Sequence, residues 1–154
     1  MSEAKPLVGI ILGSKSDAPA FDGCKEMLEK FDVPYEFVIH SAHRNPDDVR
    51  DWAQGAQDRG LKVIIAGAGK AAALGGVVAS HTPLPVIAVP MKTSDLGGMD
   101  SLLSTVQMPT GVPLACVAIN GTKNAAILAT QVLGVSMPKY RQAIVDYKRE
   151  LAEG

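Results

Sequence analysis

Short apolar segments alternate with longer helix-like segments along the whole chain, and this alternation constrains the fold more than any other feature of the sequence. The apolar segments are rich in Val and Ile and end in Gly, Pro, Ser or Asn, as β-strands do. We expect five strands, over residues 7–12, 35–40, 62–66, 86–89 and 114–119. Three of them are apolar almost throughout, which is typical of parallel strands covered on both faces.

Helical patterns fill the intervals between the expected strands. Asp17 is placed to cap the first helix, and Asn45 to cap the second, which we expect to close at Gly60. Four further helices are predicted over residues 70–81, 98–107, 122–133 and about 137–152, the last of them amphipathic.

This order of elements predicts one α/β domain over residues 1–154, a three-layer α/β/α sandwich around a five-stranded parallel sheet. We favour the strand order 2-1-3-4-5, which places a switch point between the first and third strands. Ligands bind such sheets at the carboxyl ends of the strands beside the switch point. The loops that follow the first three strands should therefore carry the function.

Charge and composition exclude several classes of protein. The 15 Lys and Arg residues nearly balance the 16 Asp and Glu residues, and no basic run stands out, which argues against a nucleic-acid partner or electrostatic attachment to a membrane. No apolar run reaches the roughly 18 residues of a membrane span. The segment Met1–Pro6 lacks the apolar core of a signal peptide, and Cys24 and Cys116 lie far apart in apolar surroundings. We therefore expect a cytoplasmic protein.

The loop after the first expected strand, Gly13–Asp17, suits an anionic ligand. Gly13 permits a tight turn, and the hydroxyls of Ser14 and Ser16 stand next to a helix N-terminus, whose free N–H groups favour negative charge. Asp17 can accept hydrogen bonds from sugar hydroxyls. A plain capped turn is the alternative interpretation.

The loop after the second expected strand contains the pair His43 and Arg44. Arg44 offers a planar fork for a phosphate group, and His43 can both donate and accept a proton near neutral pH. The alternative is a histidine that only orders the loop and an arginine in a surface ion pair. We interpret His40 and His81 as structural residues.

The third loop, Gly67–Gly76, contains only small residues apart from Lys70 and Leu74. Its GxGxxA pattern is a weak dinucleotide fingerprint, because it follows the third strand and no acidic residue lies about 20 positions further on. Small residues allow a flat ring to lie against bare backbone, although tight packing of an Ala-rich helix explains them as well. No metal-ligand cluster or carboxylate pair stands out, so we expect neither a metal nor an organic cofactor.

Six short segments, in this order, resemble the N5-carboxyaminoimidazole ribonucleotide mutase family of purine biosynthesis. They are Gly13–Asp17, Ser41–Arg44, Ile65–Gly69, Asp100–Ser104, Val106–Pro109 and Lys123–Ala126. The resemblance covers roughly residues 7–135 and implies a flavodoxin-like sheet, a homo-octamer with sites at subunit junctions, and transfer of a carboxylate from an exocyclic nitrogen to a ring carbon. The uncharged segment 71–80 also favours self-association, because a small monomer cannot easily cover it.

The resemblance also implies roles for individual residues. Ser14, Asp17 and Arg44 would bind the ribonucleotide, and His43 would carry the proton. Ser16 and Ser41 would lend hydroxyls around the phosphate, and Gly69 of the third loop is a further expected substrate-binding residue. Lys70 is a candidate to hold the migrating carboxylate, and the alternative is that it points to solvent.

The third loop departs from the mutase pattern, which reads Gly-Gly-Ala-Ala-His-Leu-Pro-Gly. Here Lys70, Ala73 and Gly75 stand in place of a Gly, the His and the Pro. The sister branch, aminoimidazole ribonucleotide carboxylase, also lacks that His, but it carries Lys at the position of Arg44 and a small residue at that of Lys15. Three hypotheses remain: a mutase, a carboxylase that uses CO2 directly, and a nucleotide-binding paralogue without this chemistry.

Overall fold

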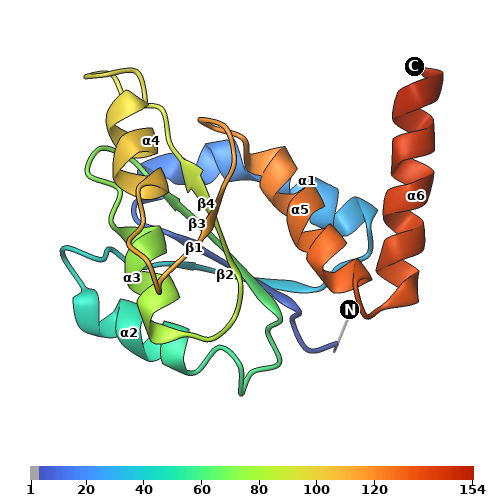
Figure 1. Cartoon of the computed structure of the whole chain (residues 1–154), viewed down its shortest axis with the longest axis horizontal. Helices are drawn as coiled ribbons and strands as arrows, with labels where there is room; N and C mark the ends of the chain where they lie inside the picture. The colour runs from blue at the N-terminus through green and yellow to red at the C-terminus, as the bar shows by residue number, and fades with distance from the viewer. Residues whose placement is uncertain (1–3) are drawn as a thin grey trace.

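A computed structural model describes residues 4–154. Of the segment Met1–Pro6, in which we expect no signal peptide, residues 1–3 lie outside the described part. Five parallel strands form one sheet in the order β2-β1-β3-β4-β5 (Figure 1). The strands are β1 (Val8–Leu12), β2 (Tyr35–Ile39), β3 (Val63–Ala68), β4 (Val86–Pro90) and β5 (Ala115–Cys116). The predicted α/β architecture and strand order are confirmed.

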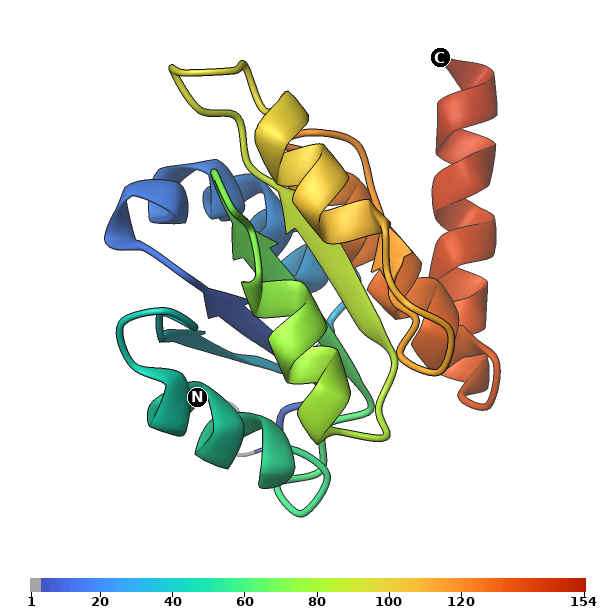
Figure 2. The same cartoon turned by 60° about the vertical axis from the view of Figure 1, so that its left-hand side comes forward.

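Helices cover both faces of the sheet (Figures 1 and 2). They are the 3-10 helix η1 (Lys15–Phe21) and the α-helices α1 (Asp22–Lys30), α2 (Pro46–Gln54), α3 (Leu74–His81), α4 (Met99–Val106), α5 (Thr122–Gly134) and α6 (Pro138–Glu153). Helices α1 and α5 pack side by side on one face, while α2 and α3 pack together on the other.

The central strands supply side chains to both layers of the core. In β1, Ile10 and Leu12 join the cluster under α1 and α5, whereas Ile11 joins the cluster under α2 and α3. All three side chains are fully buried, and each such burial stabilises the fold by about 1.5–3 kcal/mol. A run of Val and Ile without alternation is therefore what a strand covered on both faces requires.

One predicted helix start is wrong, and the other is confirmed. Asp17 does not cap α1, because the Ser14 hydroxyl accepts the capping bond from the Ser16 N–H at 3.2 Å and begins η1 instead. Pro19 lies within η1 and has no N–H to donate, so the regular helix begins only at Asp22. Asn45 is the N-cap of α2, as predicted, although its side chain makes no capping hydrogen bond to the described residues.

Three predicted boundaries also differ. Helix α2 ends at Gln54, and a turn continues to Gly60, whose φ of +97° is accessible to glycine. Helix α3 begins at Leu74 rather than at residue 70, because Lys70 has a left-handed φ of +55° that no helix accepts. Strand β5 pairs over two residues instead of six, since Pro90 at the end of β4 has no N–H to extend the ladder.

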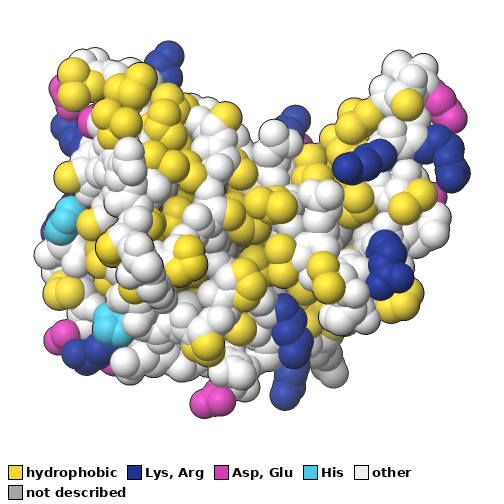
Figure 3. All heavy atoms as spheres, viewed as in Figure 1, with side chains coloured by type: hydrophobic (Ala, Val, Ile, Leu, Met, Phe, Trp, Pro, Cys, Tyr) yellow, Lys and Arg dark blue, Asp and Glu magenta, His cyan; other side chains and the backbone are white. Residues whose placement is uncertain are grey.

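The C-terminal helix α6 projects beyond the body of the molecule (Figure 1). Its first half packs on α5 and buries Tyr140 and Ile144, but Leu151 further along is 62% exposed. Hydrophobic side chains also gather on the surface near α4 (Figure 3). Within residues 4–154, no helix combines the length and the apolar character that crossing a membrane would need.

Candidate active site

A pocket of about 100 Å³ lies at the carboxyl ends of β1 and β3, where the sequence predicts a site. It is built from three loops that the sheet order brings together. Its lining residues are Gly13, Ser14, Asp17, Ser41, Ala42, His43, Arg44, Ala68, Gly69, Ala71, Ala73 and Leu74. Six of the eight predicted site residues therefore line one pocket, and the other two, Ser16 and Lys70, do not.

The first loop presents one hydroxyl and one carboxylate to the pocket. The Gly13 N–H donates to the Gly67 carbonyl at 3.0 Å, which ties this loop to the end of β3. Ser16 does not line the pocket, but its hydroxyl oxygen lies 2.9 Å from that of Ser14. A hydrogen bond between the two hydroxyls orients Ser14, which does line the pocket. Asp17 is half-buried, and this burial raises the pKa of its carboxyl above the ordinary value of 3.8.

The second loop is folded around the Ser41 hydroxyl. This oxygen accepts hydrogen bonds from the Arg44 backbone N–H at 3.2 Å and from the Arg44 Nε–H at 3.3 Å. These bonds hold the Nε end of the guanidinium group in place. Its two terminal nitrogens have no partner among residues 4–154. His43 is exposed and makes no hydrogen bond within the same described range, so its ring is free to meet a ligand.

A second pocket of about 340 Å³ adjoins the first and shares four of its residues, Gly13, Ser14, Ser41 and Arg44. Lys15 lines this second pocket, which gives the groove two cationic side chains at one end. Two cations, two hydroxyls and a helix N-terminus suit an anionic group such as a phosphate. Lys15 is not among the site residues expected from the sequence. Its position between the two expected site residues Ser14 and Ser16 could have indicated this role.

The third loop forms a wall of small residues. A Cβ atom at Gly67 would lie 2.5 Å from the Phe21 ring, so only glycine fits between β3 and η1. Beyond it, Gly69, Ala71 and Ala73 line the pocket and leave room for a flat ring to approach the backbone.

Lys70 points away from this pocket. Its Nζ atom lies 2.8 Å from Asp95 Oδ2, in the loop after β4. The hydrogen bond and the negative charge of Asp95 raise the pKa of Lys70 above its ordinary value of 10.5. No local sequence pattern predicts this pair, because its two residues belong to different loops.

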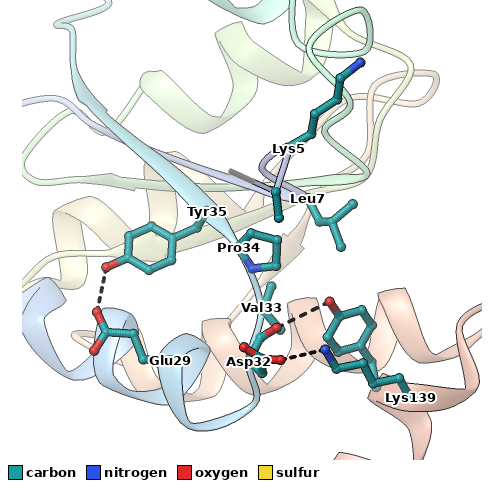
Figure 4. A pocket seen from close by; sticks show the side chains of 10 residues that line it. Lys5, Leu7, Glu29, Asp32, Val33, Pro34, Tyr35 and Lys139 are labelled. Atoms are coloured by element: carbon teal, nitrogen blue, oxygen red, sulfur yellow. Dashed lines mark hydrogen bonds and ion pairs between the residues drawn. The ribbon is translucent and has the colours of Figure 1, made fainter. Parts of the chain in front are cut away.

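A larger cavity of about 540 Å³ opens at the opposite ends of the strands (Figure 4). Two pairs of its polar side chains bind each other: the Tyr35 hydroxyl donates to Glu29 at 3.0 Å, and Lys139 lies 2.6 Å from Asp32. Among the described residues that line the cavity, Lys5 alone has a charged side chain without a partner, and its ammonium is directed away from the other labelled side chains (Figure 4). In residues 4–154 the structure also shows no group of three or more His, Cys, Asp or Glu side chains that could hold a metal ion.

Comparisons with known proteins identify the family of this chain. The model of the AIR carboxylase family matches residues 7–154. The N5-carboxyaminoimidazole ribonucleotide mutases of Thermotoga maritima and Pyrococcus horikoshii are 55% and 53% identical to this chain, over 95% and 99% of it and 85% and 89% of their own lengths. The phosphoribosylaminoimidazole carboxylase of Candida glabrata is 52% identical over 97% of this chain, which spans 26% of that protein.

Solved structures give the same result. The crystal structure of Treponema denticola PurE superposes with a TM-score of 0.87 at 30% identity, covering 96% of this chain and 92% of that one. A family model that spans nearly the whole chain, relatives above 50% identity and a shared fold are mutually consistent. The chain belongs to the AIR carboxylase family.

Proposed function

We propose that this protein is an isomerase of purine biosynthesis, an N5-carboxyaminoimidazole ribonucleotide mutase. It moves the carboxylate from the exocyclic nitrogen of its substrate to the ring carbon and forms 4-carboxy-5-aminoimidazole ribonucleotide. The observation that carries the proposal is the convergence of Asp17, His43 and Arg44, from two different loops, on one pocket walled by Gly69 and Ala73. The names of the relatives at 53–55% identity support it.

The substrate binds with its phosphate at the cationic end of the groove. Arg44 and Lys15 supply charge there, and the hydroxyls of Ser14 and Ser41 supply hydrogen bonds. Because Ser41 already engages Arg44 Nε, the terminal guanidinium nitrogens remain for the phosphate. Asp17 accepts hydrogen bonds from the ribose hydroxyls deeper in the groove.

The base then lies along the wall formed by the third loop, beside His43. When the bond from nitrogen to carboxylate breaks, His43 protonates the nitrogen and CO2 is released into the pocket. The electron-rich ring carbon attacks this CO2, and the neutral imidazole accepts the proton that the carbon loses. One imidazole therefore serves both steps, and no net proton is consumed.

We extend the proposal to a homo-octamer whose subunits cover one another's apolar surfaces. Met99, Leu103 and Val106 form a stripe on α4 and are 52%, 53% and 44% exposed, and Leu151 on α6 is exposed as well. Side chains of this kind on two separate helices favour burial against further copies of the chain. The free thiols of Cys24 and Cys116 fit a reducing compartment, and we place the enzyme in the cytoplasm.

Direct carboxylation of aminoimidazole ribonucleotide by CO2 is the second candidate. The carboxylase of Candida glabrata is about as similar to this chain as the mutases are, so identity alone does not separate the two reactions. Ala73 and Gly75 also make the third loop smaller than in the mutase pattern. A mutase must retain the CO2 that it releases, whereas a carboxylase must admit CO2 from the solution.

A single-turnover experiment with labelled bicarbonate distinguishes the candidates. We expect the nitrogen-carboxylated substrate to be converted without added bicarbonate, and label from the medium to be nearly absent from the product. Extensive uptake of label, or activity only on aminoimidazole ribonucleotide with bicarbonate, would assign the protein to the carboxylases. Binding of the ribonucleotide without turnover of either substrate would favour a paralogue that lacks this chemistry.

A further inference from the structure

The wall of the pocket has two sides. Along the third loop, the alternate residues Gly69, Ala71 and Ala73 line the pocket, whereas Lys70 and Ala72 do not. Ala72 is only 3% exposed, and its backbone N–H is directed toward α4. The surface that receives the base is therefore one side of a thin strip of backbone, whose other side rests on α4 and the loop after β4.

One side chain, Ser104 of α4, holds the strip from behind. The Ser104 hydroxyl oxygen accepts a hydrogen bond from the Ala72 N–H at 2.9 Å. Its own hydrogen has the Asp100 carbonyl at 2.7 Å and the Lys70 carbonyl at 3.2 Å within reach. The hydroxyl thus connects a helix to a loop that lies 32 residues earlier in the chain.

Such a contact matters because residues 69–73 contain no large apolar side chain that could pack against the rest of the protein. Glycine and alanine contribute little packing, and glycine leaves the backbone additional freedom. The second tie to the neighbouring loop, the ion pair between Lys70 and Asp95, is exposed to solvent and correspondingly weak. The bond from Ala72 to Ser104 is therefore the contact best placed to fix the wall.

We propose that Ser104 is a positioning residue for the carboxylate transfer: through Ala72 it sets the distance between the wall at Gly69–Ala73 and the His43 ring. The inference rests on the proposed function. Ser104 does not line the pocket and touches no substrate, so it acts only through the loop. A displacement of about 1 Å at the reacting atoms is enough to lower a rate by up to ~100-fold.

Kinetics of the Ser104→Ala variant test this role. We expect kcat to fall by about 10- to 100-fold, while KM changes by less than about threefold, because the contacts of Arg44 and Asp17 with the phosphate and ribose are untouched. Ser104→Thr keeps a hydroxyl at a surface position with room for a methyl group, and it should restore kcat. Ser80→Ala is the matched control: among residues 4–154 the Ser80 hydroxyl bonds only the Val77 carbonyl of its own helix, at 2.6 Å, and its loss should change neither constant.

Amide hydrogen exchange without substrate gives a second readout that does not depend on the reaction. The Ala72 N–H should exchange about tenfold faster in Ser104→Ala and at the native rate in Ser104→Thr. If the alanine variant does not fold, Ser104→Cys, whose thiol is a weak hydrogen-bonding group, should show the same ordering.

Native kcat in Ser104→Ala overturns the inference, as does a loss confined to KM or unchanged exchange at Ala72. A wild-type protein that converts neither substrate would instead overturn the proposed function. The exchange measurement would still decide whether Ser104 fixes the loop.

Discussion

The Lys70 ammonium lies 2.8 Å from the Asp95 carboxylate, so one ion pair joins the loop after β3 to the loop after β4. Both side chains are largely exposed, and water weakens such a pair. The ion pair nevertheless determines where the Lys70 side chain points, because it holds the only charged side chain of the third loop away from the pocket. The wall that faces the substrate is therefore uncharged.

Lys70 also adopts a left-handed backbone conformation, with a φ of +55°. An alanine at this position keeps the conformational strain, whereas a glycine relieves it. Lys70→Gly and Lys70→Ala both lose the ion pair, so the difference in stability between the two variants isolates the effect of the backbone conformation. We expect Lys70→Gly to unfold at a temperature roughly 2–4 °C higher than Lys70→Ala in thermal denaturation. Equal midpoints would show that the loop does not hold this φ in solution.

Arg44 is expected to bind the substrate phosphate. A charge-assisted hydrogen bond of this type contributes roughly 1.5–3 kcal/mol, so Arg44→Ala should weaken binding by about 10- to 150-fold in calorimetry. Removal of the 5′-phosphate from the ligand should then make little further difference. Arg50→Ala is the control, since within the described part of the chain Arg50 pairs only with Asp47 and Asp51 on the surface of α2. If dephosphorylation weakens binding to the variant as much as to the wild type, the phosphate binds elsewhere.

The sheet and the place of the site follow from local sequence patterns. Buried Val and Ile runs such as Val8–Leu12 identify parallel strands, and the strand order then predicts which loops meet. One error is local, because Ser14 and Pro19 displace the start of the first helix. Others arise where a tertiary contact decides the local structure. The bond from Ala72 to Ser104, which braces the loop in front of α3, depends on residues 32 positions apart, and no periodicity reports it. The short β5 depends on Pro90 in the neighbouring strand in the same way.

His43 is expected to carry the proton in both steps of the reaction. His43→Asn keeps a polar side chain of similar reach but cannot exchange a proton near neutral pH, so turnover should fall by about 10²–10⁴-fold. Binding of the ribonucleotide product should change little in the same variant. His81→Asn, at the end of α3 and outside the pocket, should retain native turnover. Native turnover in His43→Asn would exclude this residue from the mechanism.

Asp17 gives the site a dependence on pH. Burial raises the pKa of its carboxyl above 3.8, and the ionised form is the one that accepts hydrogen bonds from the ribose. Binding is therefore fully present above the raised pKa and is lost as the pH falls through it. This loss occurs at a higher pH than it would for an exposed aspartate. The substrate phosphate also titrates, near pH 6, so the comparison with Asp17→Asn isolates the carboxyl. We expect affinity for the product, measured by titration from neutral to acidic pH, to fall more steeply in the wild type than in the variant.

The effect of Asp17 on folding has the opposite sign, because a raised pKa means that the folded chain holds this proton more tightly than the unfolded chain. The Asp17 contribution to the free energy of unfolding should thus decrease as the pH rises from 3.8 through the raised pKa. Parallel pH profiles of binding in the wild type and in Asp17→Asn would remove Asp17 from the ribose site.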